Sequence, residues 1–368
     1  MPLKVVHVSP LYFSDQSVIG GGERYVHELA TAMARQSDVQ VRLVSFGRQR
    51  SVVTRHGFTT SIYPVWFYLG KKNVSPVSPL FFKELFWADI IHCHQYQSVV
   101  TDLCVLFARA FRKKLFVSDH GGGGKHYAHR LHTGDHVHGF LLVTEHLARQ
   151  YARYRDRVTV IYGGFDPGHF FPRDVTRERR VLCVARLVPF KGQNWLIQAV
   201  PADTELCLIG KAYDARYERD LRRLAAGKRV GFAALGTDEA SQEELAHVYS
   251  AAAVKVLPSV YYDMYGKHHP KSEILGLVLL EAMGCGTPTV VTSVGGMPEL
   301  VADGETGFVV RPADPAALWE KIATLLDSPA QARQMGQAGR ERALSRFTWR
   351  HVAQRCLDAY TTALDARG

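Results

Sequence analysis

The sequence predicts an α/β protein with a doubly wound, parallel sheet in each half of the chain. Short apolar strands alternate with helical segments, as expected where helices connect parallel strands. This alternation restarts after a segment rich in Gly, Asp and Pro at 163–172, a composition typical of an interdomain hinge. A length of 368 residues is enough for two or three domains.

The first half contains four clear strand patterns and two helices. We expect strands at 3–8, 39–46, 89–94 and 115–120, helices at 22–35 and 99–111, and a strand that runs into a short helix at 140–154. Ligands of doubly wound sheets bind beyond the carboxyl ends of strands. That rule selects His94, Asp119 and His120. A run of glycines that includes Gly21 and Gly22 precedes the first helix and allows close approach of a ligand.

The second half repeats the pattern and adds two cations at its first loop. Residues 180–200 read as strand, loop and helix, and further strands are expected at 205–210, 228–236 and 307–312. Helices are expected at 314–326, 330–345 and 346–364. Arg186 and Lys191 lie between the strand and the helix of 180–200, where two cations can clamp a diphosphate.

The stretch from Glu273 to Glu299 carries the strongest chemical signal. Two carboxylates, Glu273 and Glu281, flank an apolar segment in which we predict a helix at 277–284, followed by a buried strand at 289–292 and a helix whose first residue is Pro298. The backbone N–H groups of Gly276, Leu277 and Val278 would face an anion at the helix start. Carboxylates on either side of an anion site fit the hydroxyls of a nucleotide sugar.

These residues resemble a known signature. Glu273, seven residues, Glu281 and then AMGCGTPTVVTSVGGMPELV are similar to the signature of the retaining glycosyltransferases of family 4. The resemblance implies the GT-B fold: two Rossmann-like domains that face a central cleft, with a C-terminal helix that crosses back to the N-domain. It places an acceptor domain at 1–165, a nucleotide-sugar domain at 166–346 and the returning helix at 347–368.

The resemblance also implies roles for single residues. Glu273 is expected to bind hydroxyls of the donor sugar and Glu281 the ribose, with His120 near the donor sugar as a second catalytic residue. Gly21 or Gly22 would contact the diphosphate together with Arg186 and Lys191. The loop at 232–237 would hold the base. Two departures from the family pattern are Gly163-Gly164 in place of Asn-Gly, and Ala185 where a glycine is common.

The function implied is transfer of a hexosyl unit, with retention, from a UDP- or GDP-linked sugar to a glycan, lipid-linked or small-molecule acceptor. A sugar-nucleotide epimerase and a non-catalytic nucleotide-binding protein remain as alternatives. A dinucleotide oxidoreductase is disfavoured because neither half contains GxGxxG. We expect no cofactor and no metal requirement, since no Asp-x-Asp occurs to bridge a diphosphate through a metal.

Charge and cysteine content bear on partners and location. Residues 1–172 hold 20 Lys and Arg against 12 Asp and Glu, so most of the net charge of +10 lies in the first half. Such an excess, which includes Arg109 and residues 112–114, favours contact with an anionic membrane or an acidic acceptor. No nucleic-acid recognition motif accompanies it. Six scattered cysteines and a short apolar run at the N-terminus predict a cytoplasmic protein with peripheral membrane contact left open.

Overall fold

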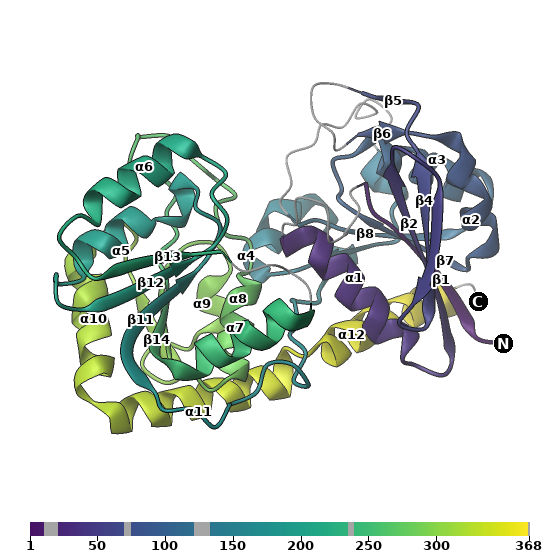
Figure 1. Ribbon diagram of the computed structural model, residues 1–368. Helices are drawn as coiled ribbons and strands as arrows, with labels where there is room; N and C mark the ends of the chain where they lie inside the picture. The colour runs from purple at the N-terminus through teal and green to yellow at the C-terminus, as the bar shows by residue number, and fades with distance from the viewer. Residues whose placement is uncertain (11–20, 70–74, 121–132, 235–238, 367–368) are drawn as a thin grey trace. The chain divides into compact units, whose positions relative to one another are not determined.

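The structure is a computed structural model that describes residues 1–10, 21–69, 75–120, 133–234 and 239–366 (Figure 1). The chain divides into two compact units. The first contains residues 1–163 and 349–368, and the second contains residues 164–348. Each unit contains a largely or wholly parallel sheet, which confirms the predicted α/β class.

In the described part of the first unit the main sheet has eight strands in the order β10-β9-β8-β7-β1-β2-β4-β3. All neighbours run parallel except β3 and β4. The central strands are buried on both faces, as expected where helices cover a parallel sheet. The strands are β1 (Leu3–Val8), β2 (Val39–Gly47), β3 (Ser51–Arg55), β4 (Phe58–Pro64), β7 (Ile90–His94), β8 (Lys114–Ser118), β9 (Gly139–Leu142) and β10 (Val158–Val160).

The antiparallel pair β3–β4 was not predicted from the sequence. Its two-residue turn is His56-Gly57, with φ of 52° and 83°. A tight hairpin turn needs positive φ at both central residues, so the His-Gly pair between two runs of β-branched residues was the signal. A second small sheet pairs β5 (Phe67–Tyr68) with β6 (Pro76–Val77).

Helices attach to this sheet through buried apolar faces and a few polar anchors. Arg42 on β2 donates to the Glu84 carboxylate at 2.7 Å, and its guanidinium lies 4.0 Å from the centre of the Trp87 ring. Both partners belong to α2, so this contact fixes that helix to the sheet. The helices are α1 (Gly21–Ala34), α2 (Phe82–Trp87), α3 (Val99–Ala110), α4 (Glu145–Ala148) and α12 (Trp349–Asp365), with 3₁₀ turns η1 (Pro79–Phe81), η3 (Thr133–His136) and η4 (Arg149–Arg157).

The C-terminal helix α12 belongs to the first unit, where it runs beside α1 (Figure 1). The ring centres of Tyr25 on α1 and Trp349 on α12 are 5.0 Å apart, edge to face. The helix begins at Trp349 and not at residue 346, because α11 continues through Arg346.

In the described part of the second unit the sheet is wholly parallel, with the order β13-β12-β11-β14-β15-β16. The strands are β11 (Glu178–Val184), β12 (Glu205–Ile209), β13 (Val230–Ala233), β14 (Ala252–Leu257), β15 (Thr289–Thr292) and β16 (Gly307–Val310). The helices are α5 (Gln193–Ala199), α6 (Ala215–Leu224), α7 (Glu239–Ala251), α8 (Leu277–Gly284), α9 (Met297–Leu300), α10 (Pro315–Asp327) and α11 (Pro329–Arg346), with one 3₁₀ turn, η5 (Pro189–Lys191).

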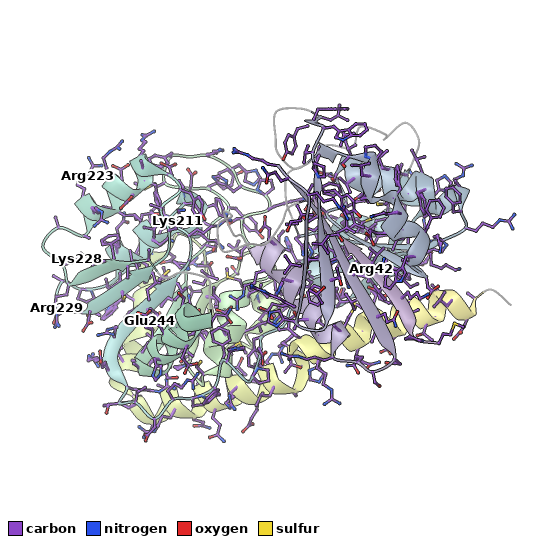
Figure 2. The ribbon with its side chains drawn as sticks, turned by 45° about the vertical axis from the view of Figure 1, so that its right-hand side comes forward. Arg42, Lys211, Arg223, Lys228, Arg229 and Glu244 are labelled. Atoms are coloured by element: carbon purple, nitrogen blue, oxygen red, sulfur yellow. The ribbon has the colours of Figure 1, made fainter. Side chains whose placement is uncertain are left out.

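Local signals predicted this unit well. Helix α8 and strand β15 have the predicted bounds, and α6 is amphipathic, with Arg223 pointing into solvent (Figure 2). Helix α7 and strand β14 were not predicted, and one predicted bound was wrong. Helix α9 begins at Met297, with Gly296 as its N-cap, so Pro298 occupies the second helical position.

Candidate functional site

The start of α8 presents free backbone donors, as the sequence predicted. Gly276 caps the helix with φ of 94°, a left-handed conformation that favours glycine. Among the described residues, no acceptor bonds the N–H groups of Leu277 and Val278. First-turn N–H groups have no intrahelical partner, and together with the helix dipole they attract an anion. This helix start can therefore hold a phosphate.

Glu273 lies just before this helix and is bonded to a cation that the sequence assigned to the diphosphate. The Lys191 ammonium donates to the Glu273 carboxylate, and Ser259 Oγ donates to the same oxygen at 3.1 Å. Both charged side chains are largely buried. An ammonium has three N–H donors. Lys191 can therefore hold Glu273 in place and still donate to a phosphate.

Arg186 differs from Lys191 in its surroundings. Its side chain is exposed, and its guanidinium lies 5.7 Å from the centre of the Tyr213 ring. Its backbone carbonyl accepts a hydrogen bond from Gln193 Nε2 at 2.9 Å, which fixes the loop. Within the described residues Arg186 forms no ion pair. The full charge of this guanidinium is available to a ligand.

Glu281 is almost fully buried, as the apolar residues around it predicted. Tyr249 Oη donates to its carboxylate at 3.2 Å. A carboxylate has several acceptor sites, so this bond orients the side chain and leaves further capacity for a ligand hydroxyl.

A second buried cation, Lys255, was not predicted from the sequence. Lys255 lies on β14 with no exposed surface, and its ammonium donates to the carbonyl of Val256 at 2.8 Å. Burial lowers the pKa of Lys255 to about 8, while the carboxylates of Glu273 and Glu281 act to raise it. Its signal in the sequence was a single lysine inside the apolar strand AAVKVL.

A glycine turn holds the Glu273 loop from the other side. Gly295 has φ of 58°, and a Cβ atom there would lie 1.5 Å from the Glu273 carbonyl oxygen. The N–H of Gly296 bonds the Ile274 carbonyl at 3.2 Å, and the N–H of Gly295 bonds Tyr261 Oη at 2.9 Å. Only glycine permits this approach, so the Gly-Gly pair positions Glu273.

In the first unit the structure brings together Gly22 and His120, two residues predicted separately. A Cβ atom on Gly22 would lie 3.4 Å from the Cβ atom of His120. The His120 ring is flanked by that of Tyr25, with ring centres 4.6 Å apart. Gly21 is the first residue of α1, so both predicted glycines begin this helix beside the predicted histidine.

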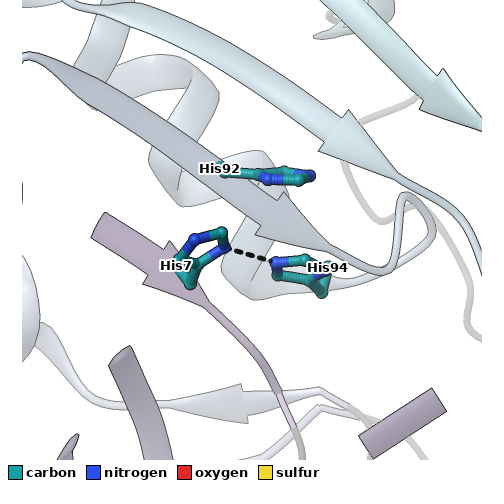
Figure 3. Close-up of side chains that lie close together, drawn as sticks. All are labelled: His7, His92 and His94. Carbon is teal, nitrogen blue, oxygen red and sulfur yellow. Dashed lines mark hydrogen bonds between the residues drawn. The ribbon is translucent and has the colours of Figure 1, made fainter. Parts of the chain in front are cut away.

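Three more histidines lie beside one another on β1 and β7, and one of them, His94, contacts His120. His7 is the register partner of His92, and His92 and His94 point to the same face of β7 because side chains alternate along a strand. His94 Nδ1 lies 3.2 Å from His120 Nε2. The ring nitrogens of His7, His92 and His94 lie within 4.8 Å of one another (Figure 3). The strand-end rule found His94 but could not find its neighbours.

The other strand-end residue, Asp119, has a structural partner. It is buried and accepts a hydrogen bond from Tyr151 Oη at 2.7 Å. That contact ties η4 to the end of β8. For the predicted base-binding loop, residues 235–237 lie outside the described part of the chain.

Basic residues among 109–114 line a cavity at the N-terminal ends of strands in the first sheet, opposite the strand ends that carry His94 and His120. The cavity has a volume of about 1280 Å³, and its walls include Lys4 and Lys114, which lie at the N-terminal ends of β1 and β8. Lys113 is already engaged, since its ammonium donates to the carbonyl of Ala88 at 2.6 Å. No described helix is both long and apolar enough to cross a bilayer.

Comparisons with known proteins match both halves of the chain. Residues 168–342 match the family described as Glycosyl transferases group 1, and residues 19–169 match Glycosyltransferase Family 4. The GDP-mannose-dependent alpha-(1-6)-phosphatidylinositol monomannoside mannosyltransferase of Mycolicibacterium smegmatis is 36% identical over 197 residues, 51% of this chain and 49% of that protein. The alpha-maltose-1-phosphate synthase of the same organism is 32% identical over 232 residues, 56% of this chain and 57% of that protein. The chain spans about half the length of these curated relatives.

Solved structures match nearly the whole chain. Sucrose-phosphate synthase from Thermosynechococcus elongatus has a TM-score of 0.72 at 22% identity, covering 99% of this chain and 100% of that chain. The Anabaena protein HepE in complex with UDP has a TM-score of 0.73 at 19% identity, covering 98% of this chain and 100% of that chain. At these identities the likeness concerns the fold, and it confirms the predicted GT-B class.

Proposed function

Because this chain belongs to the glycosyltransferases described by the group 1 and family 4 matches, we propose that it transfers a glycosyl unit from a nucleoside-diphosphate sugar to an acceptor hydroxyl, with retention. The observation that carries this proposal is the segment from Glu273 to Glu281. It combines a buried carboxylate bonded to Lys191, a helix start with free N–H donors and a second buried carboxylate. In a nucleoside-diphosphate sugar, the sugar, the diphosphate and the ribose follow one another in that order, and their groups are complementary to these three features in turn.

Negative charge develops on the leaving diphosphate as the glycosidic bond breaks. Lys191, the exposed Arg186 and the N–H groups of Leu277 and Val278 would stabilise that charge, and preorganised donors of this kind supply a large part of many rate enhancements. Glu273 and Glu281 are assigned to binding the sugar and the ribose, and among the described residues we identify no carboxylate pair with the acid and nucleophile roles of a double displacement. We therefore infer attack on the face from which the diphosphate leaves, with a phosphate oxygen taking the acceptor proton.

The donor is proposed to carry uridine or guanosine. Two of the similar proteins support this choice. The mannosyltransferase is named as GDP-mannose-dependent, which favours guanosine, and the Anabaena structure contains UDP, which favours uridine. Neutralisation of the diphosphate by protein groups leads us to propose that no metal is required. The epimerase alternative has no support among the relatives and structures described above.

The acceptor is proposed to carry a phosphate, as a lipid headgroup or on a small molecule. Relatives are named for phosphatidylinositol monomannoside, D-inositol 3-phosphate and maltose-1-phosphate, which all contain one. The basic excess of residues 1–172 would attract such an acceptor.

We also propose peripheral contact with anionic lipid. In the first unit Trp66 and Phe67 expose 61% and 53% of their surface, next to the exposed Tyr68. Aromatic side chains of this kind favour the headgroup region of a bilayer. Flotation with phosphatidylglycerol vesicles at low and high salt tests this, with a Trp66→Ser variant that should float less. Absence of co-flotation at low salt would contradict the membrane proposal and leave the transferase proposal standing.

The function itself is tested in two steps. A thermal-shift screen with UDP, GDP, ADP, dTDP and NAD should raise the melting temperature with UDP or GDP, since ligand at ~100 times its Kd stabilises by about 2.7 kcal/mol. The matching sugar nucleotides are then incubated with phosphorylated and neutral acceptors. Release of the nucleoside diphosphate together with an α-linked product from an α-linked donor supports the proposal. Conversion of the sugar without release of the diphosphate means an epimerase, and binding without turnover on any acceptor favours the non-catalytic alternative.

A further inference from the structure

A chain of three histidines leads from the core of the first unit to His120. His7 Nδ1 lies 2.8 Å from His94 Nε2 (Figure 3), and His94 Nδ1 lies 3.2 Å from His120 Nε2. The rings of His94 and His120 are nearly parallel, at an interplanar angle of 8°. We call His7, His94 and His120 the histidine chain. His7 and His94 are fully buried, whereas His120 is partly exposed.

The two hydrogen bonds couple the tautomers of the three rings. Burial lowers the pKa of His7 to about 3, that of His120 to about 4, and that of His94 well below its usual value, so all three rings are neutral at pH 7. A neutral imidazole has one N–H donor and one bare nitrogen acceptor. Each hydrogen bond of the histidine chain needs one N–H donor and one bare nitrogen acceptor. The three rings therefore all carry their proton on Nδ1, or all carry it on Nε2.

The inner end of the chain distinguishes these two states. His7 Nε2 is buried and forms no hydrogen bond among the described residues. With the protons on Nε2, His7 would bury an unpaired N–H donor. With the protons on Nδ1, His7 Nε2 is a bare acceptor, so only a lone pair is left without a partner. Buried N–H groups without a partner are rarer in proteins than under-satisfied acceptors, which favours the Nδ1–H state.

The outer end of the histidine chain is His120 Nδ1. In the Nδ1–H state, His120 accepts from His94 at Nε2 and carries its remaining proton on Nδ1. Among the described residues, no acceptor bonds His120 Nδ1. This N–H is therefore left for a ligand.

We propose that the histidine chain holds His120 as the Nδ1–H tautomer, so that His120 offers a hydrogen-bond donor, and not a base, to a substrate oxygen. His94 and His7 are then positioning residues that act through His120. The identification of that oxygen as one on the donor sugar rests on the proposed function, whereas the tautomer does not.

A metal ion held by His7, His92 and His94 is the alternative for the same residues. Both ring nitrogens of His92 already face neutral partners, Ser118 Oγ at 2.8 Å and Tyr360 Oη at 2.7 Å. The ring centres of His92 and His94 are 4.2 Å apart with an interplanar angle of 32°, so ring faces meet and the lone pairs do not converge. Together with the His7–His94 hydrogen bond, this geometry favours the hydrogen-bonded chain.

The tautomers are measured directly by long-range ¹H–¹⁵N NMR of the full chain labelled at histidine nitrogens. We expect His7, His94 and His120 each to show a protonated Nδ1 and a bare Nε2 at pH 7. A bare Nδ1 on His120 overturns the proposal, whatever the protein catalyses. So does a shift of the His7 and His94 signals on addition of one equivalent of zinc, which would mean a metal site.

Two variants on neighbouring residues separate positioning from folding. His94→Phe removes both bonds of the chain, so His120 should become a mixture of tautomers. His92→Phe is the matched control, since His92 lies on the same strand, is equally buried and does not contact His120 by a hydrogen bond. It should leave the His120 signals unchanged. A mixture in both variants, or in neither, contradicts the proposal.

The effect on transfer is tested only if turnover is found. His94→Phe should lower kcat about tenfold and leave the Kd of free nucleoside diphosphate within twofold, since one hydrogen bond is lost where the sugar reacts. His92→Phe should change neither. Equal loss of kcat in both variants would overturn the positioning role while leaving the transferase proposal intact.

Discussion

The ammonium of Lys191 and the carboxylate of Glu273 form a largely buried ion pair, although 82 positions separate them in the sequence. This pair joins the group proposed to neutralise the diphosphate to the group proposed to bind the sugar. Lys191 is therefore proposed to have two roles, one toward the diphosphate and one toward Glu273, and its substitution should have two consequences.

Lys191→Ala should weaken binding of nucleoside diphosphate by roughly 1.5–3 kcal/mol, because a charge-assisted hydrogen bond is lost. It should also destabilise the second unit by on the order of 3 kcal/mol, because Glu273 is left as an unpaired, mostly buried charge. Arg186→Ala is the matched control, since it removes an exposed cation and should weaken nucleotide binding without loss of stability. Calorimetric titration and urea unfolding measure the two effects.

The double variant Lys191→Ala, Glu273→Gln should regain stability but not nucleotide affinity, because it removes both the cation and the unpaired charge. Recovery of neither quantity would mean that the ion pair is not what holds this loop.

Glu281→Gln and Glu273→Gln should separate nucleotide binding from turnover. Glu281→Gln keeps the shape of the side chain but removes its charge, so it should weaken binding of free nucleoside diphosphate by about 1–2 kcal/mol. Glu273→Gln should leave that binding nearly unchanged and lower kcat, because its ligand is present only in the intact donor. Titration with the nucleotide and with the donor, combined with steady-state kinetics, measures both. Equal loss of nucleotide affinity in the two variants would show that the division of roles is wrong.

Gly295→Ala should displace the Glu273 loop, since the new Cβ atom would lie 1.5 Å from the Glu273 carbonyl oxygen. Gly304→Ala is a matched control with φ of 75° and no atom within 4 Å of the new Cβ. The control should cost only backbone strain, about 1–2 kcal/mol. Gly295→Ala should cost roughly 1–3 kcal/mol more, as overpacked sites do, and should lower kcat. Unfolding and turnover measurements on both variants check this, and indistinguishable losses would contradict the positioning role of the turn.

The buried histidines should make the first unit sensitive to acid. Unfolded histidine titrates near pH 6.5, whereas burial lowers the pKa of His7 to about 3. Below pH 6.5 the unfolded chain therefore binds a proton that the folded chain excludes, and stability falls by about 1.4 kcal/mol per pH unit for such a histidine until the pH nears 3. Urea unfolding between pH 7 and 4 measures the slope. His7→Phe should reduce it by about one proton. A slope unchanged by His7→Phe would refute this origin of acid sensitivity.

Turnover should survive EDTA, because protein cations and the start of α8 are proposed to neutralise the diphosphate. The rate is compared after dialysis against EDTA and after addition of Mg²⁺ or Mn²⁺. Complete loss with EDTA that either ion restores would mean that the metal supplies this charge.

Local signals in the sequence determined most of the second unit. The bounds of α8 and β15 follow from an apolar run ended by Gly286 and Pro288, and from a short β-branched strand, which are short-range effects. The same signals selected Glu273, Glu281, Arg186 and Lys191. Where the local signal was weaker, as at the His56-Gly57 turn, an element was missed.

Contacts between distant residues were decided only by the tertiary structure. His7 meets His94 because β1 lies beside β7 in the sheet, and Lys191 meets Glu273 because two loops converge beyond the strand ends. The order of strands in a parallel sheet depends on how the crossovers pack, which no local pattern encodes. The sequence by itself therefore determined the elements and the chemical groups of this protein, while strand order and packing decided which groups are partners.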